Sequence, residues 1–139
     1  MAKRISLWIM ALFYVAAGIR HFTHTSFYMQ MMPPFVPAHL TMVYVSGVAE
    51  AALGLALLIP RLSRHAAWVL VALLICVFPA NLYMWIADVH IDGRAVPPVF
   101  HAIRLPFQAV FIAWAYWHTR GGDQRATAQL EHAPPPRAT

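Results

Sequence analysis

Hydrophobic and polar positions form long alternating blocks along this chain. Four mainly apolar blocks cover residues 5–21, 40–59, 64–87 and 98–118, and short segments with prolines and polar residues separate them. A bilayer core of about 30 Å is crossed by roughly 17 to 25 residues of α-helix, so each block is long enough. The pattern therefore predicts an all-α fold, a four-helix transmembrane bundle.

Composition indicates lipid rather than water as the surrounding medium. Of the 139 residues, 60% are hydrophobic and 11% are charged, and the mean hydropathy is +0.58, outside the usual balance of soluble domains. The net charge of +5 comes from basic residues dispersed near the ends of the apolar blocks, which argues against a nucleic-acid-binding surface. Cys76 is the only cysteine, which excludes a CxxC pair, a disulfide framework and a thiolate zinc site.

The basic residues predict how the bundle is oriented. In a chain that crosses four times, one side holds Lys3, Arg4, Arg61, Arg64, Arg120, Arg125 and Arg137, and the other holds Arg20, Arg94 and the deeper Arg104. Because cytoplasmic loops are enriched in Lys and Arg, we expect a multi-pass membrane protein with both termini in the cytoplasm. Residues 1–120 would form the membrane domain, and residues 121–139 would be a disordered tail.

The first block has an alternative interpretation. Lys3 and Arg4 precede an apolar run with small residues around 16–18, a pattern that also describes a cleaved secretory signal. We favour a retained first helix, because the polar residues that follow the run match polar residues in the other three blocks.

Glu50 is the most unusual residue of the second block. It lies in SGVAEAALG, residues 46–54, and shares a helix face with Gly47, Ala51 and Gly54: counted from Gly47, Glu50, Ala51 and Gly54 follow at spacings of three, four and seven. A charged group at the bilayer centre costs at least about 2.5 to 3.5 kcal/mol. The carboxyl group is therefore expected to face the bundle interior, where the small neighbours allow close helix packing.

The other blocks carry matching polar stripes. These are Tyr14, Gly18 and His21 in the first, Asn81 in the third, and His101, Arg104 and Gln108 in the fourth. At about 1.5 Å per residue, Glu50 and Gln108 lie about 15 Å below the outer surface and Arg104 about 9 Å below it. We therefore predict an ion pair of Arg104 with Glu50, with Arg20 as a second possible partner.

The polar positions predict a binding site in the outer part of the bundle. Its candidate residues are His21, Glu50, Asn81, Arg104 and Gln108, and Glu50 is the candidate for a catalytic role. The alternative is that polar contacts only hold the helices together, for about 1 to 2 kcal/mol each. We favour a functional site for the acid and the base, because a buried charge pair is a poor stabiliser for its desolvation cost.

The segment between the first two blocks, FTHTSFYMQMMPPFVPAH at 22–39, is too polar to span and too apolar for an ordinary loop. Aromatic rings and methionines suit the membrane interface. We expect an interfacial segment that covers the outer mouth of the bundle, with a simple interfacial anchor as the alternative.

Histidines raise the question of metals. His21 and His24 could join Glu50 or His101 around zinc or copper, but two histidines three apart are a weak signal and Glu50 lies deep. Haem would need facing pairs, such as His21 with His101 or His65 with His118, and all four lie near span ends. We expect no metal.

Six segments, taken in order, resemble the DoxX-like family of small bacterial membrane proteins over nearly all of residues 5–120. They are AAGIRHF, YMQMMPPFVP, VYVSGVAEAALGL, LLIPRLSRHAAW, FPANLYMW and IRLPFQAVFIAWAYWHTR. The resemblance implies a location in a bacterial inner membrane. It also implies polar family positions at His21, Ser46, Glu50, Asn81, Arg104 and Gln108. Some members of the family are membrane subunits of thiosulfate:quinone oxidoreductases, others accompany redox or detoxification systems, and many are uncharacterised.

We therefore expect a protein that binds a small amphiphile, such as a quinone, in an outer-leaflet polar pocket as accessory to a redox system. One alternative is a membrane subunit of a quinone-linked oxidoreductase, with Glu50 as proton acceptor. Another is an assembly or chaperone partner of a second membrane protein. Expected partners are the bilayer and a redox subunit or further copies of the chain; no cofactor is certain, although a quinone is a candidate.

Overall fold

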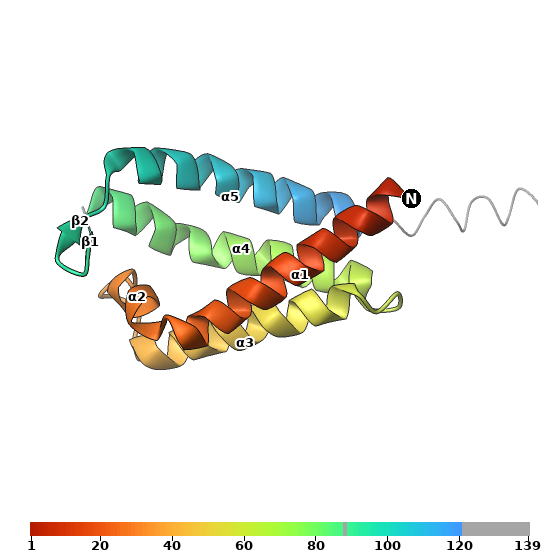
Figure 1. Cartoon of the computed structure of the whole chain (residues 1–139), viewed down its shortest axis with the longest axis horizontal. Helices are drawn as coiled ribbons and strands as arrows, with labels where there is room; N and C mark the ends of the chain where they lie inside the picture. The colour runs from red at the N-terminus through yellow and green to blue at the C-terminus, as the bar shows by residue number, and fades with distance from the viewer. Residues whose placement is uncertain (88, 121–139) are drawn as a thin grey trace, which may run out of the picture.

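The computed structural model describes residues 1–87 and 89–120. Within them, four long helices form a bundle: α1 (Ala2–Thr23), α3 (His39–Leu57), α4 (Ser63–Ile86) and α5 (Pro98–Thr119). A short helix, α2 (Thr25–Gln30), follows α1 (Figure 1). All four long helices are long and apolar enough to cross a membrane. The all-α four-helix bundle predicted from the sequence is confirmed; the predicted tail, 121–139, lies outside the described residues.

The bundle consists of two helix pairs that separate toward one end. Helix α1 packs along α3, and α4 packs along α5. The pairs are close where the start of α1 meets the end of α5, and they diverge toward α2 (Figure 1). We call the end where the start of α1 meets the end of α5 the termini end. We call the opposite end, where α2 lies, the lid end. At the termini end, the Ser6 hydroxyl accepts a hydrogen bond from the Trp114 indole at 2.8 Å and lies 3.1 Å from His118 Nε2.

Glycines allow α1 and α3 to lie in direct backbone contact. A Cβ atom at Gly18 would lie 2.5 Å from the Gly47 carbonyl oxygen, and one at Gly54 would lie 2.8 Å from the Ala11 carbonyl oxygen. Neither position has room for a larger side chain. The small-residue face predicted around Glu50 therefore packs against α1, as small residues commonly do between membrane helices.

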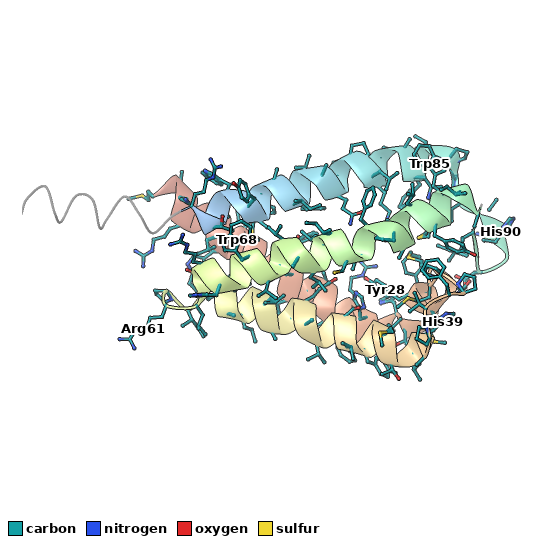
Figure 2. The ribbon with its side chains drawn as sticks, turned by 180° about the vertical axis from the view of Figure 1, so that it is seen from behind. Tyr28, His39, Arg61, Trp68, Trp85 and His90 are labelled. Carbon is teal, nitrogen blue, oxygen red and sulfur yellow. The ribbon has the colours of Figure 1, made fainter. Side chains whose placement is uncertain are left out.

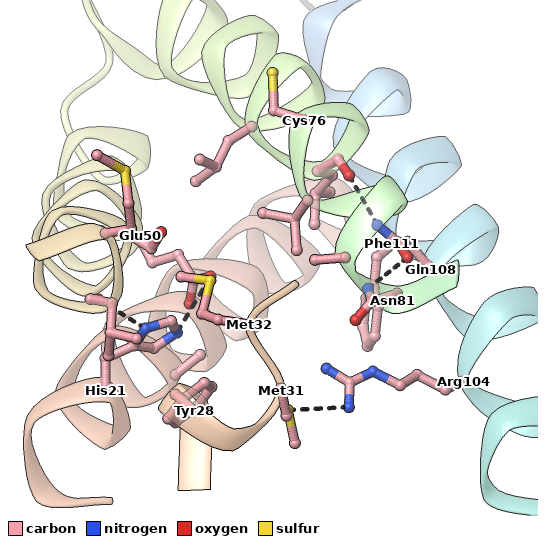
Figure 3. A pocket seen from close by; sticks show the side chains of 18 of the residues that line it. His21, Tyr28, Met31, Met32, Glu50, Cys76, Asn81, Arg104, Gln108 and Phe111 are labelled. Carbon is pink, nitrogen blue, oxygen red and sulfur yellow. Dashed lines mark hydrogen bonds and ion pairs between the residues drawn. The ribbon is translucent and has the colours of Figure 1, made fainter. Parts of the chain in front are cut away.

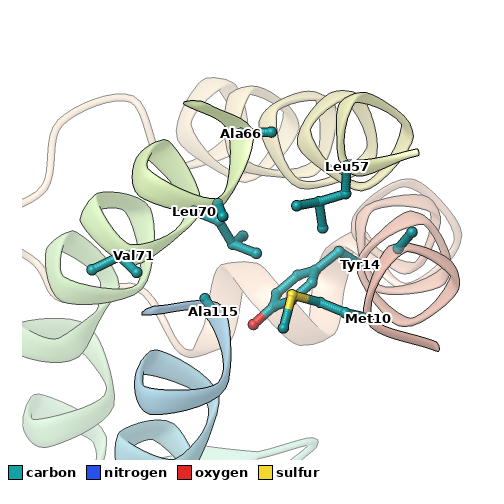
Figure 4. Close-up of a cluster of buried hydrophobic side chains, with 9 residues drawn as sticks. Met10, Tyr14, Leu57, Ala66, Leu70, Val71 and Ala115 are labelled. Carbon is teal, nitrogen blue, oxygen red and sulfur yellow. The ribbon is translucent and has the colours of Figure 1, made fainter. Parts of the chain in front are cut away.

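Apolar side chains fill the half of the bundle near the termini end. Its core includes Met10, Ala11, Tyr14, Leu57, Leu70 and Ala115 (Figure 4). Large apolar side chains also cover the outside of the bundle, where Trp68 and Trp85 lie toward opposite ends (Figure 2). Such a surface suits lipid, and tryptophans near both ends are typical of membrane interfaces.

The connection between α4 and α5 contains a small hairpin that the sequence analysis treated only as a break. Strand β1 (His90–Ile91) pairs antiparallel with β2 (Arg94–Ala95). Asp92 and Gly93 form the turn with φ values of 52° and 74°. Two consecutive left-handed residues, with sequence Asp-Gly, are the signature of a tight hairpin turn, so the local sequence did contain this signal.

Candidate functional site

A cavity of about 490 Å³ lies between the two helix pairs, in the half near the lid end. All five predicted site residues line it: His21 from α1, Glu50 from α3, Asn81 from α4, and Arg104 and Gln108 from α5 (Figure 3). Its volume is in the range of about 300 to 1,000 Å³ typical of small-molecule sites. The polar stripes of the four spans therefore converge on one space.

On the α1–α3 side of the cavity, Glu50 is paired with His21. The carboxyl Oε1 lies 3.7 Å from His21 Nε2, which is beyond ordinary hydrogen-bond length. The other ring nitrogen, Nδ1, donates to the Val43 carbonyl at 3.0 Å. Since a carbonyl can only accept, Nδ1 carries a proton, and this fixes the ring with Nε2 turned toward the acid.

The predicted ion pair of Arg104 with Glu50 is wrong. Within the described residues, neither Arg104 nor Arg20 forms an ion pair with Glu50; Arg104 Nη1 instead contacts Met31 Sδ at 3.6 Å. The physical reason is lateral separation, because α3 and α5 belong to different helix pairs with the cavity between them. Helix α1 packs directly on α3, and this places His21, not an arginine, next to Glu50.

On the α4–α5 side, two amide side chains form a buried chain of hydrogen bonds. Asn81 Nδ2 donates to Gln108 Oε1 at 2.6 Å, and Gln108 Nε2 donates to the Leu74 carbonyl at 2.8 Å. Both residues are buried. These bonds orient the two amides at the cavity wall, and their remaining donor and acceptor capacity can serve a ligand.

The segment that follows α1 forms a lid over the cavity. We define the lid as residues 25–37; four of its side chains, Tyr28, Met31, Met32 and Val36, line the cavity. The Tyr28 ring stacks on His21 with centroids 3.9 Å apart. Burial raises the pKa of Tyr28, and the nearby Glu50 raises it further, so the phenol keeps its proton and can donate. The predicted cover of the bundle mouth is present.

The lid is also tied to the hairpin. Gln30 Nε2 donates to Asp92 Oδ1 at 3.1 Å, and the Asp92 backbone N–H donates to Gln30 Oε1 at 2.7 Å. This reciprocal contact joins the two connections at the lid end of the bundle.

Residues 10–119 match a protein family described as a domain of unknown function, DUF8561. The chain belongs to the DUF8561 family. The matched region of this DUF8561 protein contains every residue that lines the cavity. No curated protein and no solved structure matches the chain, and the resemblance to the DoxX-like family stays a prediction.

Aromatic side chains of the cavity wall were missed by the sequence analysis. Phe13 of α1 stacks on Phe111 of α5 with ring centroids 5.0 Å apart, and Phe107 lies next to Phe111. Phe13 and Phe107 are 44% and 54% exposed, although both line the cavity. The cavity of this DUF8561 protein is thus bounded on the α1–α5 side by rings that also reach the outer surface. The spacing of four between Phe107 and Phe111 was the available signal.

Two buried polar groups have no hydrogen-bond partner among the described residues. The Tyr14 hydroxyl is one, on a residue that lines the cavity. His101 is the other: it shares the helix face of Arg104, but it is 3% exposed and is not among the cavity-lining residues. The sequence did not indicate that either group would lack a hydrogen-bond partner among the described residues.

The other histidines in residues 1–87 and 89–120 are not among the residues that line the cavity. His24 Nδ1 lies 2.8 Å from the Thr23 hydroxyl, and His118 contacts Ser6 at the termini end. Among the residues that the structure describes, no group of three or more His, Cys, Asp and Glu side chains could hold a metal ion.

Proposed function

We propose that this DUF8561 protein binds a small amphiphile in the cavity beneath the lid, in the outer leaflet of a bacterial inner membrane, as accessory to a redox system. The observation that carries the proposal is the cavity itself: polar groups from all four spans converge there, and apolar rings line the remainder. Polar side chains that persist within membrane spans usually face a bundle interior or a cavity and mark functional positions.

The two sides of the cavity suit a head group with polar atoms at opposite edges. Glu50 and His21 stand on one side, and Asn81 and Gln108 on the other. A quinone ring carries two such oxygens and a hydrocarbon tail, which the half-exposed Phe13 and Phe107 would admit from the lipid. The predominance of basic residues at the termini end supports an outer position for the cavity.

A redox role is supported by the DoxX-like resemblance, since relatives in that family include membrane subunits of thiosulfate:quinone oxidoreductases. Cys76 is the chain's single cysteine and is exposed, so an internal dithiol is unavailable as an electron carrier. Electrons would come from a partner subunit, and this chain would hold the amphiphile.

The proposal is tested by filling the cavity. Ala80 lines it, whereas Ala72, on the same helix, is exposed and does not. We expect protein purified in mild detergent to contain an amphiphile, extracted and identified by mass spectrometry. Ala80→Trp should reduce its amount at least tenfold, and Ala72→Trp should leave it unchanged. Wild-type protein without any co-purifying quinone or lipid, or equal amounts in both variants, would contradict the proposal.

A second candidate is a membrane subunit of a quinone-linked oxidoreductase, and the contact of Glu50 with His21 favours it. An acid beside an imidazole can exchange protons with a bound quinone. Glu50→Gln keeps the size of the side chain and removes the acid, so it should abolish quinone reduction in native membranes while the protein stays folded. Unchanged reduction would exclude this role.

A further inference from the structure

A positive charge in the cavity has no carboxylate partner among the described residues. Arg104 projects from α5 toward the lid, and its Nη1 contacts Met31 Sδ (Figure 3). The part of the chain that the structure describes contains two acidic residues. Glu50 lies beside His21, and Asp92 accepts from Gln30. Arg104 is thus left facing a neutral sulfur.

A guanidinium in this position is expected to pair with an anion. Arginine stays protonated in proteins, and a thioether is a weak acceptor without charge. Arg104 lies within a span, about 9 Å along α5 from its first residue at about 1.5 Å per residue. Charges within membrane spans generally have partners, and the planar guanidinium fork matches a carboxylate or a phosphate with two parallel hydrogen bonds.

The surroundings of Arg104 suit a molecule that is anionic at one end and apolar at the other. The lid methionines Met31 and Met32 lie on one side of the cavity, and Phe107 lies one turn further along α5. Beyond it, Phe13 and Phe111 stack across the space between the helix pairs. An acid bound at Arg104 can therefore lay its hydrocarbon chain along these rings toward the bilayer.

We infer that Arg104 binds an anionic head group, so that the amphiphile in the cavity is a carboxylate or a phosphate ester. The inference rests on the proposed function and narrows it. A neutral quinone would satisfy the amides and leave the guanidinium without a counter-charge from the described residues, whereas an acid would supply one.

The experiment compares acidic and neutral lauroyl probes of equal chain length, together with one quinone, on the full-length protein in a non-ionic detergent. The probes are radiolabelled laurate, methyl laurate, lauroyl lysophosphatidate and a short-chain ubiquinone. Binding is measured for the wild type, for Arg104→Gln, and for Arg94→Gln as a matched control. Arg94 is exposed on β2 and does not line the cavity.

We expect the wild type to bind laurate or lysophosphatidate at least tenfold more tightly than methyl laurate. Arg104→Gln should lose this preference and still bind the ester as the wild type does, which shows that the cavity is intact; Arg94→Gln should keep it. If laurate shows this preference, the ligand is a fatty acid; if lysophosphatidate shows it, the ligand is a lipid phosphate. Equal binding of acids, ester and quinone by the wild type, or a preference that survives Arg104→Gln, would overturn the inference and leave the proposed function standing. Absence of binding by all four probes would overturn both.

Discussion

The two halves of the bundle are built from the same four helices and differ in how they are filled. Near the termini end, Met10, Leu57 and Leu70 are fully buried in a packed apolar core. Near the lid end, the helix pairs diverge around a cavity of about 490 Å³ with polar groups on both sides. Close packing of apolar side chains determines the structure of the half near the termini end. In the half near the lid end, polar side chains face the interior because they must avoid lipid.

This difference follows from the solvent. In a bilayer, an apolar side chain gains little by leaving lipid, so helices associate through close packing of complementary surfaces. A polar side chain has a strong reason to face inward whether or not the interior is full. The half near the termini end therefore provides stability, and the half near the lid end can keep an open space without exposing polar groups to hydrocarbon.

The comparison is tested most strongly by two leucines one turn apart on α4, one in the packed core and one at the cavity wall. Leu70 is fully buried in the core, whereas Leu74 is partly buried and lines the cavity. Leu70→Ala should lower the free energy of unfolding by about 2 to 5 kcal/mol, the range for truncation in packed cores. Leu74→Ala should cost clearly less, because its side chain already borders on empty space. Unfolding in mixed micelles titrated with sodium dodecyl sulfate measures both, and equal costs would contradict the contrast between the halves.

A smaller loss is expected where α1 meets α3. Gly18→Val places a branched side chain against the Gly47 carbonyl, which lies 2.5 Å from the position of a Cβ atom at residue 18. Overpacking of this kind costs about 1 to 3 kcal/mol, measured by the same unfolding titration. Ala16→Val, on an exposed face of α1, is the control and should be nearly neutral. If Gly18→Val is equally neutral, the glycine contact does not hold the pair together.

Helix positions and inward faces could be predicted from the sequence because the bilayer restricts both. It fixes the length of each span and it forces polar residues inward, so polarity, spacing and depth were enough to single out five residues as inward-facing: His21, Glu50, Asn81, Arg104 and Gln108. All five line one cavity. Their role in binding stays a prediction.

Partners could not be predicted in the same way. Periodicity gives the direction of a side chain on its own helix, and depth gives its height, but neither says which helices are neighbours. The pairing of α1 with α3 brings His21 to Glu50, and the cavity keeps Arg104 apart. The contact of Gln30 with Asp92 joins positions 62 residues apart, and such a contact depends on the complete fold.

The hydrogen bond between Asn81 and Gln108 distinguishes two roles of a polar residue in a membrane span, namely lining a binding site and holding the helices together. Asn81→Ala removes the donor to Gln108 Oε1 and should lower the free energy of unfolding by about 0.6 kcal/mol, and by no more than about 1.7 kcal/mol. Thr41→Ala, at an exposed position of α3, is the control. A loss as large as that of Leu70→Ala in the same titration would mean that Asn81 mainly supports the bundle, and that the half near the lid end depends on polar contacts for its stability.

The smallest effect on stability is expected at the lid. Gln30→Ala removes both side-chain contacts with Asp92, which lie at the exposed end of the bundle, and exposed hydrogen bonds contribute about 1 kcal/mol or less. The global free energy of unfolding should therefore hardly change. Amide hydrogen exchange in residues 25–37 should become faster, because local opening of the lid no longer breaks this contact, while exchange in α4 near Leu70 stays the same. Thr41→Ala, at the exposed position of α3 already used above, serves as the control. Exchange that accelerates equally in the lid and in α4 would show that the lid opens only with the whole bundle, and that the two halves are not independent.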